Sequence, residues 1–423
     1  MGRGVFITMP AHGHLNPTLP VVAELVRRGE SIDYYGAESF RAAIESAGAR
    51  FRPLDGRYAE FEKTLDPGDG LFALGEFVAE ATLDALPRVE AELRDARPDY
   101  VLYDSMTPLG RFVATRLGLP AVATFPSFGT RPDALPLPPV PVLLLAMGGP
   151  LKLRRNLRWH RRRAAVAKST AERFSVDELG FGNIVSNPTA CNLVFTSERF
   201  QVHRERLDER YHFVGPCLGE RPADPSFPLS RLDGKRVIYI SLGTAFNAAV
   251  GFFHECLRAF AGREETVVMS IGSRVDAAAF GQIPENFIVR AHVPQLDVLR
   301  RASLFITHAG MNGVSEALTL GVPMLAYPQA ADQFLVARRI AALGVGRRIG
   351  RRDVTAPRLR QLATEVFDDA KIRASVADVG ASLRDAGGPA RAADIVLSHV
   401  ARASDPSRRG QRRATAGSGV TAT

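Results

Sequence analysis

Short apolar segments rich in β-forming residues alternate with helical segments along this chain, and the alternation occurs twice. The first series of strand-like segments comprises residues 5–9, 32–35, 50–53 and 100–103. The second series comprises residues 236–241, 266–270, 287–291, 304–307 and 324–327. Strands that alternate with helices are typical of parallel, doubly wound sheets. We therefore expect an α/β fold with two doubly wound domains that face each other across a cleft.

A stretch rich in Pro, Asp, Ser and Gly, residues 219–235, separates the two series and has the composition of a linker. We expect an N-terminal domain over residues 1–218 and a C-terminal domain over residues 236–385. A final helix at residues 386–402 is expected to pack back toward the N-terminal domain. Residues 403–423 contain Gly, Ser, Thr and Arg with almost no apolar side chains, which predicts a disordered basic tail.

The net charge of +9 is concentrated in two segments. Residues 152–163 carry seven Lys and Arg and no acid, and residues 402–423 carry a net charge of +4, so the rest is near neutral. A nucleic-acid-binding face is usually spread over a folded surface and interleaved with aromatic side chains, and only Trp159 lies among these charges. We therefore expect no nucleic-acid partner.

The Arg-rich segment at residues 152–163 follows an apolar, Pro-rich stretch, and three interpretations of it stay open. It can be a solvated surface helix, the wall of a pocket for an apolar substrate, or a contact with anionic lipid. We favour the pocket wall over the membrane contact.

Cysteine usage and hydropathy limit the compartment. The three cysteines are widely spaced without a C-x-x-C pair, which favours a reducing cytoplasm and argues against a structural zinc site. The longest apolar stretch, residues 140–147, is far shorter than the ~20 residues that a membrane-spanning helix requires. The N-terminus runs directly into a strand-like segment instead of a signal peptide. We expect a cytoplasmic protein, monomeric or homodimeric.

Two histidines, His12 and His14, lie in the loop that follows the first predicted strand. Asn16 and Pro17 are suited to be the N-cap and first residue of the next helix. A helix N-terminus favours the neutral form of a nearby imidazole, and a neutral imidazole can act as a general base. We favour His14 for this role, with His12 as the reserve; simple hydrogen bonding in the turn and adventitious metal binding are the alternatives.

A carboxylate follows a second strand of the same series. Asp104 comes directly after residues 100–103, so it is expected at the same edge of the sheet as His14. Alone, Asp104 would be interpreted as a helix N-cap. Beside a histidine, its carboxylate would fix the imidazole tautomer and stabilise the protonated ring. The two residues together predict a His–Asp pair.

Glycine-containing turns end two strands of the second series. Residues 241–244 read Ser-Leu-Gly-Thr, and residues 308–313 read His-Ala-Gly-Met-Asn-Gly before a helix expected at 314–320. Backbone N–H groups at such junctions bind anions, and phosphate is the anion that helix N-termini commonly hold. The chain has no G-x-x-x-x-G-K-[ST] motif, and no G-x-G-x-x-G motif follows either leading strand. These absences argue against phosphoryl transfer from ATP and against a dinucleotide oxidoreductase.

The stretch from residue 292 to residue 333, HVPQLDVLRRASLFITHAGMNGVSEALTLGVPMLAYPQAADQ, resembles the nucleotide-sugar-binding signature of the family 1 glycosyltransferases. The chain from residue 4 to about residue 400 is similar to the bacterial macrolide and natural-product branch of that family. The resemblance implies the GT-B fold, in which two Rossmann-like domains face a cleft.

The resemblance also implies roles for individual residues. His14 matches the family's general base, and Asp104 matches its partner. Glu316 and Gln295 match residues that contact the ribose and base, whereas Asp332 and Gln333 match the pair that binds the hydroxyls of the sugar. The remaining expected nucleotide and diphosphate contacts are Ser241, Gly243, Thr244, His292, Val293, His308, Gly310, Met311, Asn312 and Gly313. The expected acceptor pocket comprises His12, Phe125, Ser127, Phe128, Leu143 and Met147.

Two positions depart from the family signature. His292 stands where a tryptophan usually stacks on the base, and Gly313 stands where a serine usually follows the asparagine. A smaller ring should stack more weakly on the base, so the choice between a UDP-sugar and a TDP-sugar stays open.

We accordingly expect an inverting, metal-independent glycosyltransferase that needs no cofactor. Its donor would be UDP-glucose first and a TDP-linked deoxysugar second, and its acceptor an apolar macrolide, polyketide or phenolic compound. Two alternatives are a nucleotide-sugar epimerase or hydrolase and a non-catalytic accessory protein on the same fold.

Overall fold

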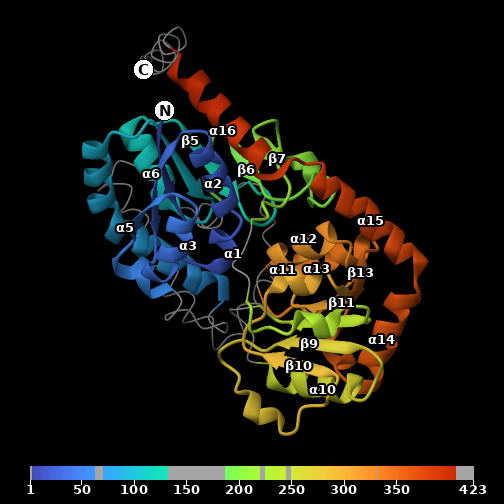
Figure 1. The fold of residues 1–423 in the computed structure, drawn as a ribbon. Helices are drawn as coiled ribbons and strands as arrows, with labels where there is room; N and C mark the ends of the chain where they lie inside the picture. Colours follow the sequence, from blue (N-terminus) through green and yellow to red (C-terminus); the bar gives the residue numbers. More distant parts are fainter. Residues whose placement is uncertain are drawn as a thin grey trace, which may run out of the picture.

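The computed structural model describes residues 2–61, 70–131, 186–219, 224–243, 249–330 and 332–405. These residues form two lobes, each built on one parallel sheet (Figure 1). Within the described chain, the sheet of the N-terminal lobe has seven strands in the order β3 (Arg50–Pro53), β2 (Ser31–Gly36), β1 (Arg3–Ile7), β4 (Tyr100–Asp104), β5 (Ala121–Phe125), β6 (Asn192–Val194) and β7 (Tyr211–Phe213). The described part of the C-terminal lobe has six strands in the order β10 (Phe287–Arg290), β9 (Thr266–Ser270), β8 (Val237–Ser241), β11 (Ala302–Thr307), β12 (Met324–Ala326) and β13 (Gly346–Arg348).

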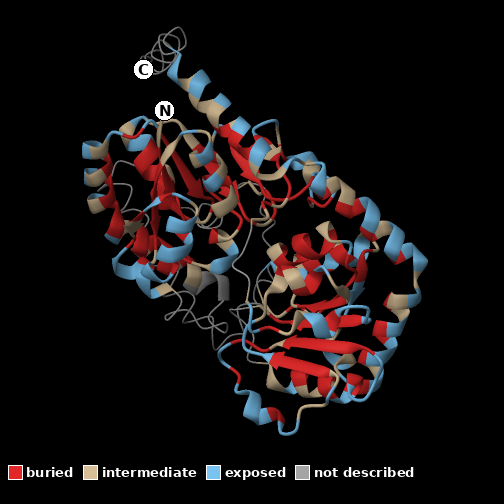
Figure 2. Ribbon diagram, viewed as in Figure 1, coloured by how far each residue is buried: buried red, intermediate tan, exposed pale blue. Residues whose placement is uncertain are grey.

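Alternate residues of each N-terminal strand point to opposite faces of the sheet, and both faces are covered. Val5 and Ile7 belong to the core cluster on the side of α5 (Gly70–Ala96) and α6 (Pro108–Leu117), whereas Phe6 belongs to the cluster on the side of α2 (Leu19–Arg27) and α3 (Arg41–Ser46). Figure 2 shows that the buried residues are concentrated in the two sheets. The helices of this lobe are α1 (His12–Leu15), α2 (Leu19–Arg27), α3 (Arg41–Ser46), α5 (Gly70–Ala96) and α6 (Pro108–Leu117), with short 3₁₀ turns at Glu38–Phe40, Gly56–Glu60 and Arg204–Arg206.

The C-terminal lobe alternates strands and helices in the same way around a single large core cluster. Its helices are α10 (Val250–Phe260), α11 (Gln295–Leu299), α12 (Met311–Thr319), α13 (Gln333–Ala342), α14 (Ala356–Asp368) and α15 (Ala370–Arg384), with 3₁₀ turns at Leu229–Leu232, Ala277–Phe280 and Arg351–Asp353. Among the helices of the described residues, none combines the length and the hydropathy that a membrane-spanning segment requires.

The last helix, α16 (Gly388–Ser404), leaves the C-terminal lobe and lies along the N-terminal lobe beside α2 (Figure 1). Its apolar residues Ala392, Ala393 and Val396 are fully buried in the N-terminal core cluster, and Asp394 pairs with Arg28 at the end of α2. The helix includes residues 403 and 404, so the predicted boundary between the helix and the tail at residue 403 is wrong by two residues. Helix α16, which follows the C-terminal domain in the sequence, therefore completes the core of the N-terminal domain.

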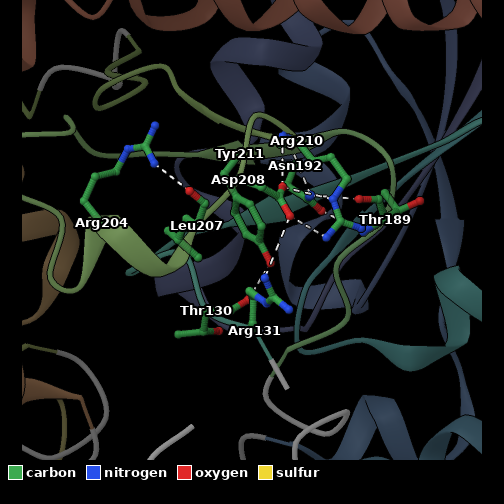
Figure 3. Close-up of polar contacts among 9 residues, drawn as sticks. All are labelled: Thr130, Arg131, Thr189, Asn192, Arg204, Leu207, Asp208, Arg210 and Tyr211. Atoms are coloured by element: carbon green, nitrogen blue, oxygen red, sulfur yellow. Dashed lines mark hydrogen bonds and ion pairs between the residues drawn. The ribbon is translucent and has the colours of Figure 1, made fainter. Parts of the chain in front are cut away.

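A polar network holds the loop after β5 against the start of β7 (Figure 3). The Tyr211 hydroxyl donates to the Thr130 carbonyl at 2.9 Å, and the Ser186 hydroxyl donates to the same carbonyl at 2.7 Å. Asp208 pairs with Arg210 and, more distantly, with Arg131. Residues 130–131 and residue 186, which lie on either side of residues 132–185 in the sequence, are thus held next to each other. The Arg-rich segment 152–163 lies outside the described residues.

Two helix starts differ from our expectations. The helix after β1 begins at Leu19, with Thr18 as its N-cap and Pro20 in its first turn, instead of at Asn16 and Pro17. His12–Leu15, which precede the expected start, form the separate short helix α1 that contains both histidines. Helix α12 begins at Met311, three residues before the expected start, so Asn312 and Gly313 belong to its first turn.

Candidate active site

His14 and Asp104 meet at the carboxyl ends of β1 and β4. The strand order of the N-terminal sheet reverses direction between these two strands, and the crevice at such a switch point is where open α/β sheets bind ligands. His14 Nδ1 lies 2.8 Å from Asp104 Oδ2, and the other carboxylate oxygen accepts a hydrogen bond from the Met106 backbone N–H at 2.8 Å. The Asp104 side chain is fully buried, whereas that of His14 is 20% exposed. The predicted His–Asp contact is therefore present, with the imidazole open on one side.

The pKa of His14 is raised above its ordinary value. Burial lowers it, but the charge of Asp104, the hydrogen bond to Asp104 and the more distant charge of Asp332 together outweigh burial. We expected a helix start to lower the pKa of this imidazole and keep it neutral, and this expectation is wrong because the pKa is raised. Helix α1 has only four residues, and the buried carboxylate in contact with the ring makes the largest of the contributions that raise the pKa.

The turn that carries Asp104 is braced by a residue that the sequence analysis missed. Asn187 is fully buried, and its side-chain amide donates to the Ser105 carbonyl at 2.8 Å, while its own carbonyl accepts from the Tyr103 hydroxyl. Asn187 lies 82 residues from Ser105 in the sequence, so no local pattern could have revealed this contact.

In the C-terminal lobe, β8 and β11 form the corresponding switch point, and His308 follows β11. The His308 ring lies between two glycines, because a Cβ added at Gly310 would come 2.4 Å from Nε2 and one at Gly243 would come 2.6 Å from Cε1. Burial lowers the pKa of His308 to about 4, although the charge of Asp332 and a backbone hydrogen bond with Ser241 act in the opposite direction. The His308 ring is therefore neutral near pH 7.

The chain between His308 and α12 adopts a conformation that aims the helix start into the cleft. Ala309, which is fully buried, has a φ of +65°, a left-handed conformation that is uncommon for residues other than glycine. Gly310 is the N-cap and has no side-chain cap, and the first turn of α12 contains no acid. The backbone N–H groups of this turn are therefore suited to an anion.

Further along α12, Glu316 is 2% exposed and accepts a hydrogen bond from Gln295 Nε2 at 2.5 Å. The Tyr239 hydroxyl in turn donates to Gln295 Oε1 at 3.0 Å. Gln295 is the first residue of α11, so the structure brings these two expected nucleotide contacts together from separate helices. A pocket between the lobes is lined by Glu316, Ser315, Asn312, Asn16, Pro17, Phe195, Pro216, Cys217 and Leu218.

Asp332 is the N-cap of α13, and Gln333 is its first residue. Asp332 Oδ2 accepts a hydrogen bond of 2.6 Å from the Ser127 hydroxyl, which comes from the loop after β5 in the other lobe. The Gln333 side-chain oxygen accepts from the backbone N–H groups of Gln329 and Ala330 at 2.8 and 3.1 Å and so shapes the preceding loop. An expected sugar-binding residue and an expected acceptor-pocket residue are therefore in direct contact.

The structure does not gather all the expected residues. Phe125 and Phe128 are 1% and 5% exposed and pack against Tyr211 and Phe200, so they are core residues instead of open pocket walls. His12 is exposed, and its ring packs edge-on against Phe40. His292 is also exposed, whereas the neighbouring Val293 packs against the core of the C-terminal lobe. Thr244, Leu143 and Met147 lie outside the described residues. Ser241 ends β8, and its hydroxyl accepts from the Gly243 N–H.

The described residues contain no group of three or more His, Cys, Asp or Glu side chains that could hold a metal ion. The three cysteines are buried and free.

Comparison with known proteins gives the same family throughout. Residues 255–399 match the family described as erythromycin biosynthesis protein CIII-like, C-terminal domain. The chain is 33% identical over 403 residues to the NDP-glycosyltransferase YjiC of Bacillus licheniformis, covering 93% of this chain and 96% of that protein. It is 32% identical to the oleandomycin glycosyltransferase of Streptomyces antibioticus, covering 92% and 89%.

Among solved structures, the kitacinnamycin glycotransferase superposes with a TM-score of 0.81 at 31% identity, covering 94% of this chain and 99% of that one. The two parallel sheets, the alignment over nearly the whole chain and this superposition agree. The chain therefore belongs to the family 1 glycosyltransferases with the GT-B fold, in the group of nucleotide-sugar-dependent enzymes that glycosylate natural products.

Proposed function

We propose that this protein is an inverting, metal-independent glycosyltransferase that moves a hexose, glucose from UDP-glucose in the first instance, to a hydroxyl of an apolar natural product. The observation that carries the proposal is the position of the His14–Asp104 pair opposite the start of α12. The two lobes touch there through two hydrogen bonds, from Asn312 to the Gly13 carbonyl at 2.9 Å and from Ser127 to Asp332 at 2.6 Å. The charge of Asp332 acts on both His14 and His308.

In the proposed reaction, an acceptor hydroxyl enters from the N-terminal lobe and gives its proton to His14 Nε2. The hydroxyl oxygen attacks C1 of the sugar from the face opposite the diphosphate, the C1–O bond to the diphosphate breaks, and the configuration at C1 inverts. Asp104 holds Nδ1 and stabilises the imidazolium that forms. His308 and the first N–H groups of α12 stabilise the negative charge on the leaving diphosphate, which is the task a divalent metal performs in other transferases.

The donor assignment rests on Asp332 and Gln333, at the start of α13, which match the pair that binds the sugar hydroxyls in the family signature. A TDP-linked deoxysugar is the second candidate, because the exposed His292 offers a smaller stacking surface than the tryptophan that is usual there. For the acceptor, the similarity to an enzyme named for oleandomycin supports a macrolide or another polyketide, with a phenolic compound as a further class.

The test is incubation with UDP-glucose or a TDP-sugar, with and without a panel of apolar alcohols and phenols, in the presence of EDTA. The proposal requires acceptor-dependent release of UDP and a β-glucoside product that forms without metal. Release of UDP at the same rate without acceptor would identify a hydrolase instead. Turnover with the TDP-sugar alone would change the donor but leave the transferase assignment intact.

The pH dependence of transfer follows from the raised pKa of His14. Only the neutral imidazole accepts a proton, so the rate is expected to rise with pH. It should reach half of its plateau at a pH above 6.5, which is the ordinary pKa of histidine. Asp332→Asn removes one of the negative charges that raise this pKa, so the midpoint should move to lower pH. The measurement is the initial rate at saturating donor between pH 5 and 9; an unchanged midpoint in the variant would contradict the coupling.

Ser127→Ala removes the hydroxyl that orients the Asp332 carboxylate. If Asp332 binds the sugar, this variant should weaken the binding of UDP-glucose by about three- to tenfold, the factor of one hydrogen bond to a charged group that is partly exposed. UDP lacks the transferred hexose, so its Kd should not change. Calorimetric titration of both ligands into wild type and variant measures the difference, and an equal loss for UDP would show a general disturbance of the cleft.

A further inference from the structure

The side-chain amide of Asn312 crosses from the C-terminal lobe to the turn that carries His14. Asn312 is the second residue of α12, and its Nδ2 donates to the Gly13 carbonyl at 2.9 Å. The family resemblance implies that this asparagine contacts the diphosphate, yet here its amide group is directed at the backbone next to His14.

The Gly13 carbonyl is available to Asn312 because of a proline. In an α-helical turn, this carbonyl would accept from the N–H of the residue four positions later, and that residue is Pro17, which has no N–H. The neighbouring N–H groups are already used: Asn16 donates to the His12 carbonyl, and Thr18 donates to the Leu15 carbonyl. The Gly13 carbonyl therefore lacks its usual backbone donor and can accept from a group outside the turn.

The bond bears on His14 because it fixes the backbone directly before it. Asp104 holds Nδ1, which sets the ring's tautomer, but the direction of Nε2 also depends on the orientation of the α1 backbone. Gly13 is exposed, and a Cβ built on it would meet nothing within 4 Å, so little packing restrains this part of the turn. A hydrogen bond from the opposite lobe is a restraint of the kind that the turn lacks.

We propose that Asn312 is a positioning residue for His14: it holds the α1 turn through the Gly13 carbonyl, so that the base is aligned only while the two lobes are closed against each other. The proposal rests on the proposed role of His14 as general base. It links occupation of the donor site, which lies at the same helix start, to the alignment of the base across the cleft.

The first test is Asn312→Ala. A positioning role predicts that kcat falls by about five- to tenfold, the factor that corresponds to one hydrogen bond, while the Kd of UDP stays within about twofold of wild type. A phosphate ligand would give the opposite pattern, with the Kd of UDP raised and kcat little changed. That pattern would overturn the proposal. Ser382→Ala is the matched control, because it removes another hydrogen bond between the lobes, to Ser197 at 2.9 Å, and should leave kcat unchanged.

A double-mutant cycle with His14→Ala separates the two assignments. If Asn312 acts through His14, then Asn312→Ala should cause no further loss in the His14→Ala background. A further loss of the same factor in that background would show that Asn312 acts independently of the base and would reject the positioning role. Full transfer by His14→Ala alone would instead reject the general base, and with it the basis of the proposal.

Discussion

His14→Ala is expected to lower kcat for transfer by about 10²- to 10⁴-fold, the contribution that a positioned general base typically makes. An acceptor hydroxyl is a weak nucleophile while it keeps its proton, and the fully buried Asp104 leaves the open side of the His14 ring to take that proton. The donor binds in the other lobe, so the Kd of UDP-glucose should change little. The measurement is kcat from product formation at saturating donor, together with donor titration.

His254→Ala is the control for loss of an imidazole as such. His254 lies in α10 and packs against Phe280 in the C-terminal lobe, so it should leave transfer near the wild-type level. Undiminished transfer by His14→Ala would contradict the base assignment, and His12 in the same turn would then be the next candidate. A large loss of donor affinity in His14→Ala would show that the residue acts in binding instead.

The alternation of strands and helices was sufficient to predict the two doubly wound sheets, because a buried parallel strand requires a local apolar run that the sequence shows directly. The same logic located His14, Asp104, His308 and Ser241, since each lies at or shortly after the end of a strand and the carboxyl ends of parallel strands share one edge. Strands with weaker patterns were missed. β13 has two exposed arginines among its three residues, and β6 and β7 have only three residues each.

What the sequence could not reveal depends on partners far apart in the chain. A helix start was expected to lower the pKa of His14, whereas a buried carboxylate 90 residues away, with a smaller contribution from Asp332, raises it against the effect of burial. Phe125 and Phe128 suited an apolar pocket by residue type, but tertiary packing against Tyr211 and Phe200 places them in the core. Ser127 between them reaches Asp332, a contact across 205 residues that only the closed arrangement of the lobes creates.

His308→Ala is expected to lower kcat by about 10²- to 10³-fold, the usual loss when one donor to a developing negative charge is removed. Burial keeps this imidazole neutral before the donor arrives, with a pKa of about 4. A diphosphate bound at the helix start adds negative charge beside the ring, which raises the pKa and strengthens the hydrogen bond as the leaving group gains charge. The contact therefore stabilises the transition state more than the ground state, and kcat should fall more than donor affinity.

Gly310→Ala tests the position of the same imidazole without removing it. The added Cβ would come 2.4 Å from His308 Nε2, so the ring has to move out of the place between Gly310 and Gly243. We expect a loss of kcat smaller than that of His308→Ala, and little further loss when the two substitutions are combined. Gly251→Ala in α10 is the matched control, because nothing lies within 4 Å of its added Cβ. If Gly310→Ala transfers sugar as fast as wild type, the imidazole does not have to occupy this position for the diphosphate to leave.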